Sequence, residues 1–322
     1  FSRSILNLDP PDHTRLRALM VKAFNARGME AMRPGIGDLV EQLIDKVHQR
    51  GSMEVKSEFA HPIPSTIISD MLGIPEADRR RFAHLSNDIV RYGNDLLQAN
   101  DDKADQAVHE FEQYIGSLFA SKRQTPGDDL TTALINARDE QGALTEEELN
   151  QNIRLLFIAG HETTVNLICN AVIALARHDA QRQRLIQDPK LMPGAIEEFL
   201  RYDPSVQQLP RVAQQDVEMD GQTIRAGQMV VLMLGSANHD PEIYTEADQL
   251  DVTRPFTRSK SFGGGAHFCL GAQLARIETE IALNALLKRM PDFKVTNLNT
   301  LTYPPNPFFR GPERLDITWH PR

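Results

Sequence analysis

A cysteine stands at the centre of the most distinctive stretch of the sequence, Phe262 to Gly271, which reads F-G-G-G-A-H-F-C-L-G. The amphipathic segment after it predicts a helix beginning near Leu270. Free amides and the positive end of that helix would favour the thiolate of Cys269 over its thiol. Three consecutive glycines allow backbone angles that other residues avoid, and they leave room for a flat, bulky group against the main chain. The stretch therefore indicates a loop that holds a ligand.

The plainest interpretation of Cys269 is a small buried hydrophobe. A nucleophilic cysteine would need a histidine base and an orienting partner, but His267 lies on an extended loop, where we expect it to point elsewhere. A zinc site would need three or four ligands, whereas Cys169, the other cysteine, lies in an apolar helical run. Neither a nucleophile nor a zinc site accounts for the glycines, and a thiolate at this position could be a ligand or a nucleophile.

A polar cluster, A-G-H-E-T-T at Ala159 to Thr164, interrupts an otherwise apolar segment. The segment begins with a capping-box pattern, Thr145 to Glu148, and continues without proline to about Arg177. It predicts one helix of roughly thirty residues, about 45 Å long. Glycine weakens a helix, so a glycine beside Glu and Thr residues at its middle has a physical cost. Taken alone, the cluster indicates a helix that turns a polar face to water for one turn, although local weakening inside a core helix usually has a reason.

Two charged pairs share predicted helix faces. His13 and Arg17 are four residues apart and follow the helix-start signal at Asp9 to Asp12. Taken alone, their face is expected to be a solvated, charged helix face. Glu198 and Arg201 are three residues apart, a spacing that ordinarily gives a weak surface salt bridge.

These groups would be positioned by a mainly helical chain with small β-sheets, an α+β fold. Hydrophobic periodicity and Gly or Pro punctuation predict further helices at Ile36–Arg50, Ile63–Leu72, Glu76–Val90, Lys103–Lys122, Asp128–Ala137, Ala180–Asp188, Met192–Tyr202 and Leu270–Arg289. Short runs between turn signals predict strands at Met53–Val55, Val212–Met219, Gln222–Ile224, Met229–Leu232, Lys294–Thr296 and Leu315–Trp319. The polar stretch Tyr92–Asp102 is expected to be a loop, where lids often lie.

Composition limits the classes of function. The 322 residues are 41% hydrophobic and 25% charged, which is typical of a soluble globular protein. The formal net charge of −9 argues against general nucleic-acid binding, which usually requires a basic domain or face. Two widely separated cysteines provide no disulfide framework, so we expect a reducing, cytoplasmic compartment. No run approaches eighteen uninterrupted apolar residues, so we expect no membrane span in this chain.

The cysteine loop resembles the haem-ligand loop of the cytochrome P450 family, Phe-Gly-x-Gly-x-His-x-Cys-x-Gly, at every fixed position. The polar cluster is similar to the family's I-helix pattern, Ala/Gly-Gly-x-Asp/Glu-Thr, through Ala159, Gly160, Glu162 and Thr163. Glu198 and Arg201 resemble its K-helix motif, and Arg254 stands where the family has the third member of a buried structural network. The resemblance is to soluble bacterial-type members, extends from about residue 1 to the end, and implies the cytochrome P450 fold.

The resemblance implies a haem b cofactor whose iron is bound by the thiolate of Cys269. It also implies two groups of residues around the haem, the propionate donors His13, Arg17, Arg211 and His267 and the loop residues Phe262, Gly263, Gly265 and Gly271. A groove beside Ala159 and Gly160 would admit dioxygen, and Glu162 and Thr163 would relay protons to it.

The implied activity is that of a haem-thiolate monooxygenase, which inserts one oxygen atom of O2 into a lipophilic small molecule. The pocket would be apolar with one polar orienter, lined by Leu155, Ile158, Val206, Gln207, Leu209, Phe308 and Phe309. Electrons would come from NAD(P)H through a reductase and a ferredoxin or flavodoxin-type carrier. That carrier is expected to be acidic, because basic residues surround the cysteine side, namely Arg15, Lys22, Arg258, Lys260 and Arg276.

Two other activities stay open, a peroxide-driven peroxygenase and a non-catalytic or incomplete haem-binding protein. Peroxygenase-type members that take fatty acids have an I-helix arginine, which Ala159 to Thr164 lacks. Members of the family also have A and B helices and a B–C loop before the C helix. We therefore expect residues 1–322 to be one domain that starts near the C helix, as a fragment or as a shortened member. Strands Val212–Met219 and Met229–Leu232 would then keep an open edge.

Overall fold

The computed structural model describes residues 3–24, 26–93, 102–139, 142–255 and 259–321. Helices dominate: α1 (Asp12–Ala23), α2 (Ala26–Ala31), α3 (Arg33–His48), α4 (Pro62–Met71), α5 (Glu76–Gly93), α6 (Asp102–Gln124), α7 (Leu130–Asn136), α8 (Glu146–Arg177), α9 (Asp179–Gln187), α10 (Met192–Tyr202), α11 (Leu234–Ala237) and α12 (Ala272–Arg289). The strands are short: β1 (Ser52–Glu54), β2 (Arg138–Asp139), β3 (Gly142–Ala143), β4 (Gln208–Val212), β5 (Val217–Met219), β6 (Gln222–Ile224), β7 (Met229–Met233), β8 (Lys294–Val295) and β9 (Asp316–Thr318). The predicted α+β class is confirmed.

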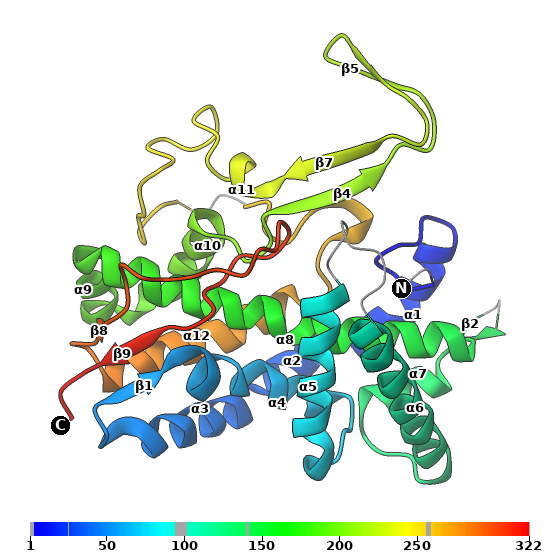
Figure 1. Ribbon diagram of the computed structural model, residues 1–322, viewed down its shortest axis with the longest axis horizontal. Coiled ribbons are helices and arrows are strands. Elements are labelled where there is room, and N and C mark those ends of the chain that lie inside the picture. Colours follow the sequence, from blue (N-terminus) through cyan, green and yellow to red (C-terminus); the bar gives the residue numbers. More distant parts are fainter. Residues whose placement is uncertain (1–2, 25, 94–101, 140–141, 256–258, 322) are drawn as a thin grey trace.

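Helix α8 runs through the middle of the molecule, and other helices are arranged along it (Figure 1). It begins as predicted, because the Glu148 amide donates to the Thr145 hydroxyl at 3.1 Å and the Thr145 amide donates to the Glu148 carboxylate at 2.9 Å. The helix continues for 32 residues, with α4 and α12 packed against it. By length and composition α8 could cross a membrane, but 72% of its most apolar window is buried in the molecule, as in a core helix.

Aromatic rings join α8 to the helices that cover its first half. The ring centroid of Phe82 in α5 lies 4.4 Å from that of Phe111 in α6 and 4.5 Å from that of Phe157 in α8. All three side chains are buried. Such pairs add about 0.5–1.5 kcal/mol beyond the burial of their surface, so this cluster fixes α5 and α6 beside the turn that precedes the polar cluster.

Four small antiparallel sheets complete the fold. Strands β1, β9 and β8 form a three-stranded sheet, in which Ile317 of β9 lies opposite Met53 on one side and Val295 on the other. Strands β2 with β3, β4 with β7, and β5 with β6 form two-stranded sheets. In the three-stranded sheet, strands from the two ends of the chain pair, and β1 packs against α3.

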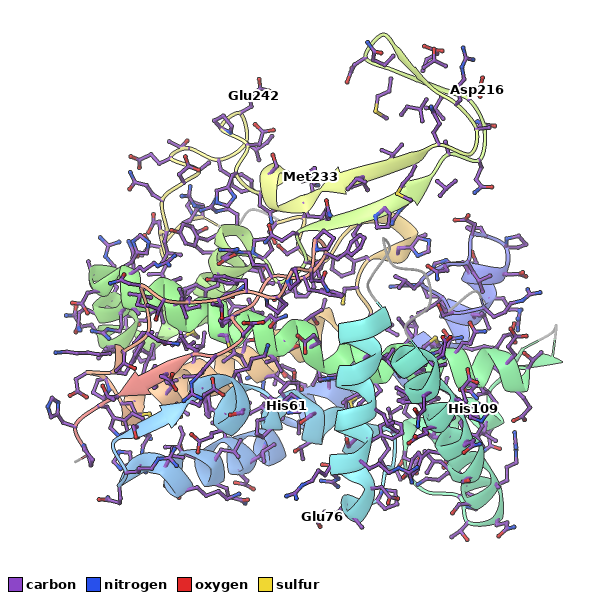
Figure 2. All side chains as sticks on the ribbon, in the orientation of Figure 1. His61, Glu76, His109, Asp216, Met233 and Glu242 are labelled. Carbon is purple, nitrogen blue, oxygen red and sulfur yellow. The ribbon has the colours of Figure 1, made fainter. Side chains whose placement is uncertain are left out.

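The β4–β7 ribbon stands above the helical body (Figure 1). Its register runs from Gln208 opposite Met233 to Val212 opposite Met229. Several apolar side chains on it are exposed, and Figure 2 shows Met233 at one end. No further strand pairs with either edge in the described part of the chain.

The single strand predicted at Val212–Met219 is wrong. The chain leaves β4 after Val212 and enters a separate hairpin, β5–β6, whose base is labelled at Asp216 in Figure 2. The carboxylate of Asp216 accepts the Ala226 amide at 2.9 Å and the Arg225 guanidinium at 2.7 Å. These bonds hold a bend between the two sheets, which the apolar pattern alone does not indicate.

Three helix starts differ from the predictions by two or more residues, and α3 begins at Arg33, three residues before the predicted Ile36. Helix α7 begins at Leu130 because the carboxylate of Asp129 accepts the Thr132 amide at 2.8 Å and so caps the helix. Helix α12 begins at Ala272, two residues later than expected. The predicted loop Tyr92–Asp102 lies largely outside the described residues.

Candidate active site

Glycines and main-chain hydrogen bonds hold the cysteine loop in shape. Gly263 and Gly265 have φ angles of 68° and 63°, the left-handed region that glycine adopts without strain. The Cys269 amide donates to the Phe262 carbonyl at 3.0 Å, and the Phe268 amide donates to the carbonyl of Gly265 at 3.2 Å. The loop therefore closes as a tight turn with Cys269 at its exit.

The sulfur of Cys269 lies just before α12 and is only partly exposed. Burial raises the pKa of its thiol, and this outweighs the Gly271 amide and the charges of Arg17 and Arg276, which lower it. The predicted preference for the thiolate at a helix start is therefore wrong for the chain by itself, because burial of the sulfur outweighs these effects. A cation bound to the sulfur would stabilise the thiolate. The described residues contain no cluster of three or more His, Cys, Asp or Glu suited to a metal ion.

His13 is buried beside this loop with unsatisfied polar atoms. It is 1% exposed, and neither ring nitrogen has a hydrogen-bond partner among the described residues. Its ring centroid lies 4.2 Å from that of His267. Burial lowers the pKa of His13, with smaller effects from His267 and Arg17. Burial likewise lowers the pKa of His267, followed by the charge of Arg211.

The structure thus brings together the four predicted propionate donors. Arg17 Nη2 donates to the Phe268 carbonyl at 2.6 Å, and Arg211 Nη1 donates to the Pro210 carbonyl at 2.8 Å. Within the described residues, neither guanidinium is hydrogen-bonded to a carboxylate. A group with two carboxylates would satisfy the buried nitrogens and balance the positive charge. The cluster therefore fits the propionates of a haem.

All four residues of the predicted catalytic set, Ala159, Gly160, Glu162 and Thr163, lie close together on α8. The Thr163 hydroxyl donates to the Ala159 carbonyl at 3.0 Å, and Glu162 is partly exposed. Gly160 has a packing reason: a β-carbon there would lie 3.0 Å from Ile68 of α4. Ile68 therefore fills the space left by the absent side chain, on the side where we expected a groove for dioxygen.

Two polar residues that sequence reasoning missed contact this turn. Asn166 Nδ2 donates to Glu162 Oε1 at 3.3 Å. The Ser205 hydroxyl donates to the Thr163 carbonyl at 2.7 Å. The spacing of four residues from Glu162 could have identified Asn166, because residues four apart share a helix face. Ser205 carries no such signal, since it comes from a segment after α10.

The predicted structural network is assembled in full. The guanidinium of Arg201 donates to both carboxylate oxygens of Glu198 at 2.7 and 2.8 Å, and both side chains are buried. Arg254 Nε lies 3.1 Å from Glu198 Oε2. Arg201 also donates to the main-chain carbonyls of Asn238, Ala247 and Gln249. One buried carboxylate therefore orders the segment between β7 and the cysteine loop.

Part of the predicted substrate pocket is brought together. Val206 forms a β-bridge with Phe309, and the Gln207 amide donates to the Phe308 carbonyl at 2.8 Å. The side chain of Gln207 donates to the carbonyl of Pro204, so it is bonded to its own segment. Leu209 is in the adjacent strand β4 and lies 3.9 Å from the β-carbon position of Gly263. Leu155 and Ile158 lie on α8, partly buried against the core.

The expected basic surface around the cysteine is reduced by internal ion pairs. The guanidinium of Arg15 is paired with Glu148, and that of Arg276 with Glu197. Lys260 is exposed. The side chains of Lys22 and Arg258 lie outside the described residues. Of the five predicted members, two are therefore engaged by carboxylates.

Comparisons with known proteins agree with this geometry. The model of the family described as "Cytochrome P450" matches residues 1–306. A putative cytochrome P450 133B2 of Xylella fastidiosa is 41% identical over 99% of this chain and 80% of its own length. The vitamin D(3) 25-hydroxylase of Pseudonocardia autotrophica is 41% identical over 98% of this chain and 77% of its own. The crystal structure of P450BioI in complex with hexadec-9Z-enoic acid ligated acyl carrier protein superposes with a TM-score of 0.94 at 38% identity, covering 99% of this chain and 82% of that one.

Proposed function

Because the chain belongs to the cytochrome P450 family and is a P450 monooxygenase, we propose that it inserts one oxygen atom of O2 into a C–H bond of a lipophilic small molecule. The observation that best supports this proposal is that the partly buried cysteine loop lies beside a cation-rich cluster around His13, whose ring nitrogens have no hydrogen-bond partner among the described residues. The second oxygen atom leaves as water, with two electrons and one proton from NAD(P)H and a second proton from solvent.

The residues present fit haem b. Cys269 would bind the iron, and His13, Arg17, Arg211 and His267 would hold the propionates. When bound, the haem supplies an iron centre that activates dioxygen, and a thiolate ligand increases the electron density that favours cleavage of the O–O bond. The Gly271 amide that donates to the sulfur would tune that ligand.

The proton path would be formed by the polar turn of α8. Glu162 is partly exposed, so its carboxylate would exchange protons with solvent. The hydroxyl of Thr163 can donate and accept, and it would pass the proton inward. The Ser205 hydroxyl, bonded to the Thr163 carbonyl, would hold this turn in place.

The substrate class follows from the lining. Leu155, Ile158, Val206 and the two phenylalanines are apolar, which suits a medium-sized lipophilic molecule. The similar proteins support this class, because one is named a vitamin D(3) hydroxylase and another was solved with a fatty acyl carrier protein. Both free lipids and carrier-bound acyl chains are therefore reasonable first substrates.

The electron donor would be a ferredoxin or flavodoxin-type protein with an NAD(P)H-dependent reductase, in the cytoplasm. Lys260 is exposed near the cysteine loop and would contact an acidic carrier. With Arg15 and Arg276 paired internally, the electrostatic attraction would be weaker than five free cations would give.

Substitution Thr163→Ala tests the proton path. Removing the hydroxyl should leave haem binding intact but lower the product formed per NAD(P)H by at least about tenfold, with hydrogen peroxide released instead. The assay uses surrogate ferredoxin and reductase with vitamin D3 and hexadec-9-enoic acid as probes. Thr279→Ala is the matched control, because the Thr279 hydroxyl also bonds the carbonyl four residues earlier but lies on α12. Unchanged coupling in Thr163→Ala would exclude this role.

A further inference from the structure

Asn166 lies one helical turn after Glu162 and is 3% exposed. Its Nδ2 donates to Glu162 Oε1 at 3.3 Å. Residues four apart on a helix face each other, so this contact needs no distortion of α8. A donor at this place orients one oxygen of a carboxylate that would otherwise sample several rotamers.

The other end of the same amide is fixed by packing. Asn166 Oδ1 is buried and has no hydrogen-bond partner among the described residues. A β-carbon on Gly311 would lie 2.0 Å from that oxygen and 2.3 Å from Cγ. The main chain at Gly311 therefore lies close to the Asn166 amide, and any side chain at position 311 would collide with it.

The turn that carries Gly311 is itself tied to α8. The Asn170 amide group donates to the Arg310 carbonyl at 3.1 Å, and the Arg310 amide donates to the Ser205 carbonyl at 2.9 Å. Ser205 in turn donates through its hydroxyl to the Thr163 carbonyl. One rigid unit, made from three parts of the chain, thus contacts both residues of the proposed proton path.

We infer that Asn166 is a positioning residue for the proton path: wedged by Gly311, it holds the Glu162 carboxylate toward Thr163. This inference rests on the proposed function, in which Glu162 supplies protons. Burying an amide oxygen without a hydrogen-bond partner costs free energy. This cost is accepted here because the same packing fixes the direction of the amide nitrogen.

Three variants test the inference in the complete haem-loaded protein. Asn166→Leu keeps the size but removes the donor, and we expect product per NAD(P)H to fall about tenfold. Asn166→Asp keeps the shape and regains a donor only when its carboxyl is protonated, so coupling should recover as the pH falls. Gly311→Ala should displace the amide and match Asn166→Leu. Gly194→Ala is the control, because a β-carbon there meets nothing within 4 Å.

A readout that does not depend on activity is the side-chain amide signal of Asn166. In asparagine-labelled, reduced and carbon-monoxide-bound protein, its ¹⁵N–¹H resonances are assigned by their loss in Asn166→Leu. We expect them to shift in Glu162→Ala and to stay in place in Thr279→Ala. Thermal unfolding of every variant shows whether a loss of coupling reflects a loss of fold.

The outcomes separate the two levels of the account. If the amide signal does not respond to Glu162→Ala, or if Asn166→Asp and Asn166→Leu have the same pH profile, the positioning role is wrong while the proposed function stands. If the amide responds but Glu162→Ala leaves coupling unchanged, Glu162 supplies no protons, and both the proton path and this inference fail. A responsive amide with pH-dependent rescue by Asn166→Asp supports the inference.

Discussion

His13 and Glu278 are both buried, and the polar atoms of both side chains have no hydrogen-bond partner among the described residues. Their surroundings differ. His13 adjoins His267 and the charge of Arg17 next to the cysteine loop. Glu278 lies on α12, and burial raises the pKa of its carboxyl. A bound group with carboxylates would explain the buried nitrogens of His13, whereas a retained proton, which keeps the carboxyl neutral, would explain the burial of Glu278.

We predict that His13→Leu weakens haem binding by about 10- to 100-fold, because a hydrogen bond to a charged group contributes about 1.5–3 kcal/mol. The measurement is a haem titration of the haem-free protein, followed by Soret absorbance. His48→Leu is the control. His48 lies on α3 and is also buried, but its ring is hydrogen-bonded to the Arg289 carbonyl. Equal affinities for His13→Leu and the parent chain would contradict the assignment of His13 to a propionate.

The buried carboxyl of Glu278 should make the free energy of unfolding depend on pH. Burial raises the pKa of its carboxyl well above the usual value, so the folded state keeps a proton that the unfolded state loses. Its contribution to stability is therefore complete below about pH 4.3 and is lost as the pH rises, by about 1.4 kcal/mol per unit until the folded-state pKa is passed. Charged groups on the neighbouring helices α3 and α10 are engaged elsewhere, as Arg33 with Glu280 and Arg276 with Glu197 show.

Glu278→Gln removes this titration. Urea unfolding at pH 5 and pH 8 should give a smaller loss of unfolding free energy between the two pH values than in the parent chain. Glu280→Gln, on the same helix but paired with Arg33, should not flatten the profile in this way. Parallel profiles for the parent and Glu278→Gln would mean that the carboxyl is ionised in the fold.

Sequence motifs identified the residues with family-wide spacing, and non-local packing determined the rest. The cysteine loop and the α8 turn could be found from residue type and order, and the family resemblance added the four residues that we predict to bind the propionates. Ser205 and Gly311 could not, because their contacts to α8 join segments far apart in the chain. The raised thiol pKa of Cys269 was missed for the same reason, since burial depends on the whole fold.

At the scale of elements, the buried carboxylate of Glu198 joins α10 to the segment that leads to the cysteine loop. Its partner Arg254 lies 56 residues away in sequence, and the carbonyls that Arg201 reaches lie up to 48 residues from Arg201. Removing one partner of a buried ion pair costs about 3–5 kcal/mol, because the other charge stays buried. The network therefore has a structural role in holding this segment and no direct role in the reaction.

We predict that Arg201→Lys lowers the free energy of unfolding by about 1–3 kcal/mol, since an ammonium group keeps the charge beside Glu198 but leaves buried carbonyls without the forked contacts of a guanidinium. Urea unfolding gives the value. Arg276→Lys serves as the control, because its pair with Glu197 is more exposed and should lose about 1 kcal/mol or less. A loss as small as the control's would show that the network contributes little to the fold.

Helices were predicted better than strands, for a physical reason. A helix shows its periodicity over ten or more residues, and the capping box of α8 marks its start in the sequence itself. Boundaries depended on single side chains, as with Asp129 at α7 and Asp216 at the bend after β4. The two-residue strands β2 and β3 carry too little pattern to be recognised.

At the scale of the whole molecule, the cysteine loop, the β4–β7 ribbon and α1 supply the cation-rich cluster, whereas α8 supplies the polar turn. Figure 1 shows α8 passing beneath the ribbon, with α1 at one side. The net charge of −9 does not prevent local concentration of positive groups beside Cys269. Distribution rather than total charge therefore determines what this site can bind.

The measurement that tests the central claim most directly is the absorption spectrum of the haem-loaded, reduced chain with carbon monoxide. We predict the red-shifted Soret band of a thiolate-ligated haem, and its loss in Cys269→His with haem still bound. A band at the position of a histidine- or thiol-ligated haem in the parent chain would contradict the assignment of Cys269 as the thiolate ligand.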